Sequence, residues 1–93
     1  MVRGGEKVTY RCEGGAQITA VYYHFADESL RFVRLRMPDG REFTLPQGLS
    51  ASGARYTDEA EWVWWIKGES ARLETRRPDG EWRSMYDACS VRQ

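Results

Sequence analysis

The 93-residue chain has a single histidine, two cysteines, no block of like charge and no long apolar run. One histidine without a nucleophile motif or a cluster of metal ligands argues against a hydrolase and against a metal site. His24 lies in an apolar segment, so we expect a packed side chain rather than a ligand. Fourteen basic and fourteen acidic residues balance and alternate along the chain, whereas a nucleic-acid partner normally requires a basic face. We therefore expect no enzyme activity, no metal, no cofactor and no nucleic-acid partner.

Apolar stretches are too short for a membrane-spanning helix, and residues 1–5 lack the apolar segment of a signal peptide. No part of the chain keeps a helical period of apolar residues over three turns. Short segments of alternating apolar and polar residues are instead separated by turn residues, with Pro-Asp-Gly at 38–40 and again at 78–80. These features predict an all-β fold of seven or eight strands, as a small antiparallel barrel or sandwich. We expect one domain over residues 1–93, with a flexible start at 1–6.

The alternation of apolar residues also predicts where the strands lie. We expect strands at 7–12, 18–25, 33–37, 41–45, 55–57, 62–67, 71–75 and 82–89. Leu30 and Phe32 fall on the opposite phase from Val33 and Leu35, which predicts a bulge near Phe32. Pro46 is expected to end the fourth strand.

Cys12 and Cys89 lie near the two ends of the chain, and neither has a second cysteine or a histidine at ligand spacing. A disulfide is favoured because a domain of this size has a small core, and a cross-link closing so long a loop contributes about 4 kcal/mol. Two buried free thiols are the alternative, and a catalytic or metal-binding pair is a third. A structural disulfide would imply an oxidising compartment, such as a periplasm or the cell exterior, and a leader already removed.

Residues 50–68 join a loop of small residues to a short extended segment, an acidic turn and a strand rich in tryptophan. The loop includes Ser50, Ser52 and Gly53, and its backbone can approach another segment closely because few of its side chains are large. A hairpin could place the loop beside the end of the strand, so that Ser52 and Lys67 share one edge of the sheet. Lys67 is one of two lysines, against twelve arginines. A plainer interpretation is a simple turn and a lysine that protects a sheet edge.

This stretch and the residues around both cysteines resemble the bacterial inhibitors of C-type lysozyme, the membrane-bound and periplasmic proteins called MliC and PliC. The resemblance extends from about residue 9 to residue 89. The matching residues are Ala-Ser-Gly-Ala-Arg-Tyr-Thr-Asp at 51–58, Trp64 or Trp65 before Lys67 and Gly68, then Glu69, Ala71, and Tyr10, Arg11, Cys12 and Cys89. The resemblance implies an eight-stranded antiparallel barrel with a Cys12–Cys89 disulfide, in the periplasm or anchored to the outer membrane through a tether outside this sequence. The implied function is inhibition of C-type lysozyme, which would be the partner.

The resemblance also implies which residues contact the enzyme. In the family, a Ser-Gly-x-x-Tyr loop and the lysine after the tryptophan strand enter the active-site cleft. The corresponding residues here are Ser52, Gly53, Tyr56 and Lys67. Tyr56 is expected to pack as a buried support for the loop. Further supporting contacts are expected from Ser50, Arg55 and Asp58.

The chain departs from the family pattern after Asp58, where Glu59, Ala60 and Glu61 stand in place of the usual Asp-Gly turn and lengthen the hairpin by one residue. A shift of one residue reverses the face of a strand, so a bulge beside the tryptophans would be needed to restore Lys67 to the family's position. The acidic turn is either a solvated hairpin or a group that steers a strongly basic lysozyme towards the rim.

Trp62, Trp64 and Trp65 place aromatic rings on both faces of one strand, and at least one ring is expected to face outward. An outward tryptophan supports a second hypothesis, a glycan-binding or adhesin-like envelope barrel, and it could equally serve a homodimer. The two hypotheses differ in their demands, because a glycan-binding barrel would need its exposed tryptophan and would be indifferent to Lys67.

Overall fold

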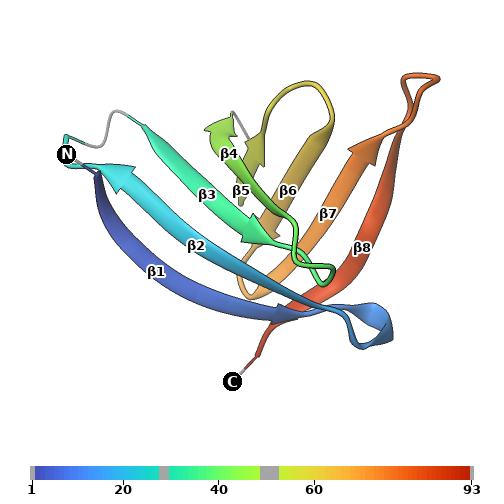
Figure 1. The fold of residues 1–93 in the computed structure, drawn as a ribbon, viewed down its shortest axis with the longest axis horizontal. Helices are drawn as coiled ribbons and strands as arrows, with labels where there is room; N and C mark the ends of the chain where they lie inside the picture. The colour runs from blue at the N-terminus through green and yellow to red at the C-terminus, as the bar shows by residue number, and fades with distance from the viewer. Residues whose placement is uncertain (1, 28–29, 49–52, 93) are drawn as a thin grey trace.

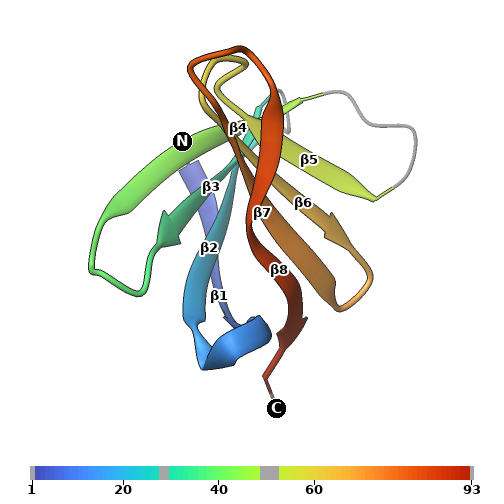
Figure 2. The ribbon, with the colours of Figure 1, turned by 90° about the vertical axis from the view of Figure 1, so that its right-hand side faces the viewer.

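The computed structural model describes residues 2–27, 30–48 and 53–92. In this part of the chain, eight antiparallel strands pair in sequence order and close into a barrel, with β8 returning to β1 (Figures 1 and 2). The strands are β1 (Val2–Arg11), β2 (Gln17–Phe25), β3 (Arg31–Arg36), β4 (Glu42–Gly48), β5 (Ala54–Thr57), β6 (Trp62–Lys67), β7 (Ser70–Arg76) and β8 (Trp82–Val91), with a 3-10 turn η1 (Glu13–Gly15). The predicted eight-stranded antiparallel barrel is confirmed. Over the same residues, no helix is long and apolar enough to cross a membrane.

The first strand is longer than the sequence predicted. It begins at Val2, which lies opposite Phe25, and its ladder with β2 shifts register once, between Gly4 and Glu6. Gly4 has φ +101°, and a Cβ there would lie 2.9 Å from the Tyr22 carbonyl oxygen, so the shift depends on glycine. The flexibility expected for residues 1–6 stays a prediction, although the structure places residues 2–6 in a paired strand.

Two expectations about β3 and β4 were wrong. The pairing of β3 with both neighbours is regular, so there is no bulge near Phe32. Phe32 instead lies on the outer face, where its ring stacks on Tyr23 with 5.1 Å between centroids, and Leu30 precedes the strand and is exposed. β4 continues through Pro46 to Gly48. A proline is tolerated there because β5 pairs only with the last two residues of β4, so the ladder on that side is short.

The core of the barrel is built around Trp64, whose side chain is fully buried. The indole Nε1 donates a hydrogen bond of 3.1 Å to the Tyr22 hydroxyl, which in turn shares a hydrogen bond of 2.8 Å with the Tyr10 hydroxyl. The Tyr10 ring meets Trp64 edge to face at 5.2 Å. Burial raises the pKa of Tyr22, so its hydroxyl keeps its proton at physiological pH. These contacts connect β1, β2 and β6 through the interior.

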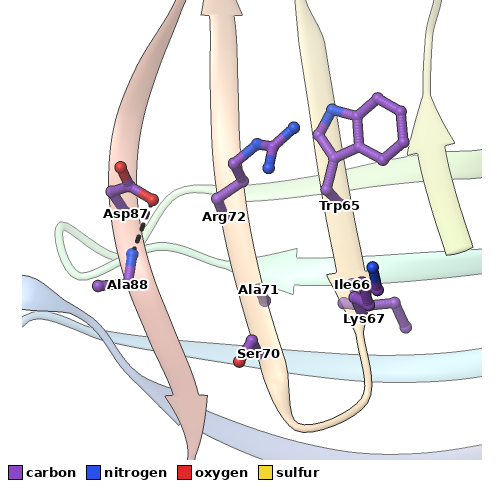
Figure 3. A pocket seen from close by; sticks show the side chains of 8 residues that line it. All are labelled: Trp65, Ile66, Lys67, Ser70, Ala71, Arg72, Asp87 and Ala88. Carbon is purple, nitrogen blue, oxygen red and sulfur yellow. Dashed lines mark hydrogen bonds between the residues drawn. The ribbon is translucent and has the colours of Figure 1, made fainter. Parts of the chain in front are cut away.

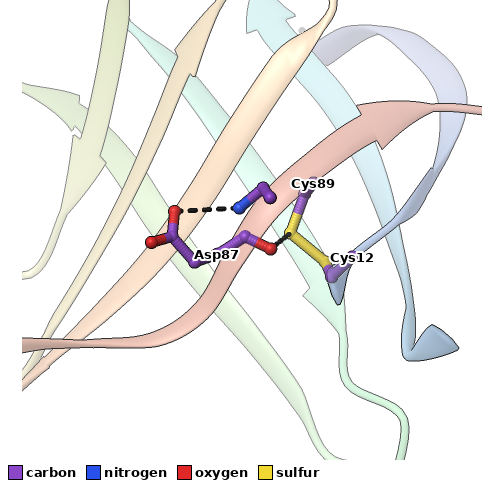
Figure 4. The surroundings of a disulfide bond; sticks show 4 residues. Cys12, Asp87 and Cys89 are labelled. Atoms are coloured by element: carbon purple, nitrogen blue, oxygen red, sulfur yellow. Dashed lines mark hydrogen bonds between the residues drawn. A yellow bond between two sulfur atoms is a disulfide. The ribbon is translucent and has the colours of Figure 1, made fainter. Parts of the chain in front are cut away.

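The barrel is closed by a short ladder and a disulfide. β1 and β8 pair through Tyr10 with Val91 and Arg11 with Ser90. Next to this ladder, the predicted disulfide joins Cys12 to Cys89 across 77 residues of sequence, and both cysteines are buried (Figure 4). The Cys89 sulfur lies 3.8 Å from the Asp87 carbonyl oxygen, which is a packing contact because a disulfide sulfur has no proton to donate. The cross-link therefore holds the seam where backbone pairing is brief.

We expect the Cys12→Ala/Cys89→Ala double variant to lose about 4 kcal/mol of unfolding free energy, because a closed loop of this length restricts the unfolded chain. Urea unfolding followed by tryptophan fluorescence measures the difference. A loss below about 1 kcal/mol would show that the remaining ladder closes the barrel without the disulfide.

Candidate functional site

The end of the small-residue loop lies directly beside the end of the tryptophan strand. Gly53 precedes β5, which pairs with β6 from Ala54 opposite Ile66 onward (Figure 2). Gly53 has φ +68°, and a Cβ at this position would collide with the Ile66 carbonyl and lie 3.3 Å from the Lys67 Cα. Only glycine allows this approach. Ser50 and Ser52 lie outside the residues that the structure describes, so their positions stay predictions.

Lys67 extends from the outer face of β6. On this strand Trp62, Trp64 and Ile66 pack in the core, whereas Trp65 is half-buried and Lys67 is exposed. The ladders that β6 forms with β5 and β7 run without a register shift, so β6 has no bulge beside the tryptophans. The turn between β5 and β6 contains a residue other than glycine with a positive φ, Glu59 at +59°.

The acidic turn, residues 58–61, is held in place by the side chains of Thr57 and Asp58. The Asp58 Oδ1 accepts hydrogen bonds from three consecutive backbone N–H groups, those of residues 60, 61 and 62, at 2.8–3.1 Å. The Thr57 hydroxyl donates to the Trp62 carbonyl at 2.7 Å and accepts from the Glu59 N–H at 2.9 Å. Partial desolvation tends to raise the pKa of Asp58, but the backbone N–H donors outweigh it and lower this pKa below its usual value. Asp58 thus has a structural task in the hairpin, and its contact with a partner stays a prediction.

Of the three tryptophans on β6, Trp65 faces outward, as the sequence predicted for at least one of these rings. Its ring is covered by two arginines, with the guanidinium carbons of Arg55 and Arg72 at 5.7 and 5.2 Å from the ring centre. Its Nε1 donates a 2.7 Å hydrogen bond to Glu74, and Arg55 forms an ion pair with Glu59 at 2.9 Å. Arg55 therefore supports β6 and the hairpin, and little of the Trp65 face is open for stacking a ligand.

Tyr56 points into the barrel. Its side chain is 6 % exposed, and its ring lies 5.7 Å from that of Tyr22. Burial raises its pKa, while the positive charge of Arg31 opposes that shift. This is the environment of a supporting side chain, and its role in binding stays a prediction.

A hollow of about 180 Å³ lies beside Lys67 on the outer surface of β6, β7 and β8 (Figure 3). The residues that line it are Trp65, Ile66, Lys67, Ser70, Ala71, Arg72, Asp87 and Ala88. Sequence reasoning did not identify Arg72, Asp87 or Ala88 as site residues. The placement of Asp87 and Ala88 depends on register shifts in the β7–β8 ladder, and no glycine or proline in β8 marks these positions. Arg72 lies opposite Trp65 in the regular β6–β7 ladder.

Comparison of the sequence with known proteins identifies a family. The profile of the family described as "Membrane-bound lysozyme-inhibitor of c-type lysozyme" matches residues 10–82. The chain belongs to this family. Three similar proteins carry the name "Membrane-bound lysozyme inhibitor of C-type lysozyme", from Pseudomonas aeruginosa (36% identical over 76 residues), Cupriavidus necator (35% over 66 residues) and Yersinia enterocolitica (38% over 69 residues). Their names describe an inhibitor rather than an enzyme.

The matches cover 82%, 71% and 74% of this chain but 54%, 50% and 53% of the three relatives. The chain therefore spans about half the length of these members of the lysozyme-inhibitor family. No solved structure matches it significantly.

In this family member, we expect Gly53→Ala to lower the unfolding free energy by about 2–3 kcal/mol, because the methyl group meets the β6 backbone and the left-handed φ is strained. Gly68→Ala is the matched control. Gly68 has a similar φ of +61° but no atom within 4 Å of an added Cβ, so it should lose only about 1 kcal/mol. Equal losses in urea unfolding would contradict the close approach of Gly53 to β6.

We expect Asp58→Asn to destabilise the protein at pH 7 by about 1 kcal/mol or less, since the site is exposed and screened. A lowered folded-state pKa contributes stability above the unfolded pKa of about 3.9, and this contribution is lost as the pH falls through the folded value. The difference between wild type and variant should therefore shrink below about pH 4. Chemical unfolding between pH 7 and pH 2 measures it, and a difference that grows in acid would contradict the assignment.

Proposed function

We propose that this protein inhibits C-type lysozyme by inserting one rim of the barrel into the active-site cleft. The observation that carries the proposal is the close approach of Gly53 to the backbone of Ile66 and Lys67, which places the end of the small-residue loop beside the lysine. The names of the three relatives, all inhibitors of C-type lysozyme, support the same partner.

The chemistry of the rim suits a glycosidase cleft. A retaining glycosidase holds two carboxyl groups roughly 5 Å apart on either side of the scissile bond. An ammonium placed between them forms charge-assisted hydrogen bonds and occupies the space of a sugar. Lysine fits a narrow cleft because it is a compact charge on a slim stem. Among the described residues, Lys67 has no carboxylate partner, so its charge is available.

The neighbours of Lys67 have separate tasks in this proposal. The Ser52 hydroxyl donates to or accepts from the second carboxylate, and Gly53 keeps the loop thin. Tyr56 supports the loop from inside the barrel. Ser50 adds a contact at the edge of the cleft, whereas Arg55 and Asp58 act by holding Trp65 and the hairpin in place.

An envelope location follows from the same proposal. The Cys12–Cys89 disulfide supports an oxidising compartment, and the relatives are named as membrane-bound. We propose a periplasmic domain or one anchored to the outer membrane by a tether outside this sequence. A homodimer stays a hypothesis.

A glycan-binding or adhesin-like barrel is the competing hypothesis, and one observation favours it. Trp82 is 40 % exposed at the start of β8, so this ring rather than Trp65 is available for stacking. Trp82→Ala should leave lysozyme inhibition unchanged. If it abolishes binding to cell-wall glycan and Lys67 variants do not, the glycan hypothesis replaces the inhibitor.

We expect Lys67→Ala to weaken lysozyme binding by about 2–5 kcal/mol with folding unchanged, because the enzyme's carboxylates are left buried without their cation. Ser52→Ala should cost about 1–2 kcal/mol, the value of one hydrogen bond to a charged partner. The measurements are the lysis rate of bacterial cells by a C-type lysozyme and calorimetric titration.

Lys7→Ala is the matched control, since Lys7 is the other lysine and is exposed on β1. It should inhibit as well as the wild type. Undiminished inhibition by Lys67→Ala would contradict the proposed role of the rim lysine, and equal losses in both lysine variants would indicate nonspecific electrostatic attraction.

A further inference from the structure

We propose that the hollow beside Lys67 is a second contact with the inhibited lysozyme, in which Asp87 receives a basic side chain from the edge of the enzyme's cleft. The inference rests on the proposed function and extends it from the rim to the outer surface of β6, β7 and β8. Figure 3 shows Lys67, Arg72 and Asp87 projecting from these three neighbouring strands.

The backbone of β8 is distorted where it borders the hollow. Leu73 of β7 lies opposite Tyr86, but Ala71 lies opposite Cys89, so β8 has one extra residue in this interval. Ala88, within the extra segment, has φ +50°, a left-handed conformation that costs about 1–2 kcal/mol for a residue with a Cβ. Bulges of this kind change the direction of a side chain. Here the distortion places Asp87 among the residues that line the hollow.

The Asp87 carboxylate retains capacity to bind a cation. One oxygen accepts the Ala88 N–H at 2.8 Å (Figure 3), and no cation among the described residues forms an ion pair with it. The guanidinium of Arg72, on the neighbouring strand, is occupied elsewhere, because it lies over the Trp65 ring and 3.9 Å from Glu74. The second oxygen of Asp87 is therefore open to a donor from outside the barrel.

The arrangement of charges indicates what kind of partner fits. Asp87 and Lys67 are separated by one intervening strand and by about two residues along the strand direction, or roughly 12 Å at the usual strand spacing and rise. A patch of this size lies well within one face of an ordinary protein interface, so a partner that covers Lys67 also covers the hollow. That partner must present carboxylates to Lys67 and a cation to Asp87. A basic enzyme with two carboxyl groups in its cleft meets both requirements.

The test is the dissociation constant for C-type lysozyme of Asp87→Asn, which removes the charge and keeps an oxygen for the Ala88 N–H. Asp79→Asn is the matched control, because its Oδ1 likewise accepts a backbone N–H, that of Glu81 at 2.9 Å, in the β7–β8 turn at the opposite end of β7 (Figure 1). We expect a rise of about 10-fold for Asp87→Asn and no change for Asp79→Asn. The rise in the dissociation constant should be smaller at 0.5 M salt, where the Debye length is about 4 Å and charge interactions are screened.

The outcomes separate the two proposals. If Lys67→Ala loses binding while Asp87→Asn binds like the wild type, the hollow is not a contact and the proposed function stands. Equal losses in Asp87→Asn and Asp79→Asn would also overturn the inference, because they would show a general effect of charge. If the wild type does not bind C-type lysozyme, both proposals fail.

Discussion

The burial of Trp64 is the constraint on which the rest of the structure depends. Its ring fills the interior, and its only polar atom is satisfied by Tyr22, which is itself bonded to Tyr10. A side chain with one donor and one available partner can occupy the core in few orientations. The orientation of Trp64 fixes which face of β6 points inward. Because side chains alternate along a strand, Trp65 and Lys67 then point outward. The outward position of Lys67 is thus set from inside the barrel.

A second constraint joins the loop to that lysine. Gly53 lies so close to β6 that a methyl group would not fit, and the ladder from Ala54 to Thr57 then continues without a shift. The turn that joins the two strands is held by Asp58, whose carboxylate accepts three backbone N–H groups. This turn is compatible with regular pairing of β5 and β6, and it lies at the opposite end of the two strands from Gly53 and Lys67.

Local alternation in the sequence predicted a small antiparallel barrel or sandwich with an outward tryptophan, and the positions of the two cysteines favoured a disulfide. The family resemblance implied the eight-stranded barrel. The prediction from local alternation was wrong where tertiary contacts override the local pattern. Phe32 suggested a bulge because an apolar residue on the outer face was not expected, but Tyr23 covers it across the ladder. The bulges of β8 could not be predicted, since Ala88 adopts a positive φ that alanine disfavours and only pairing with β7 requires. Asp87 and Ala88 were missed for this reason, whereas Arg72 lies in the regular β6–β7 ladder.

The central claim is that the rim enters the active-site cleft, and competition with a cleft-filling ligand tests it most directly. The dissociation constant for C-type lysozyme would be measured at increasing concentrations of a chitin oligosaccharide long enough to occupy the cleft. The account predicts an apparent dissociation constant that rises in proportion to the oligosaccharide concentration, because both ligands need the space between the carboxyl groups. A dissociation constant that stays constant, with a ternary complex of enzyme, oligosaccharide and inhibitor, would contradict the account.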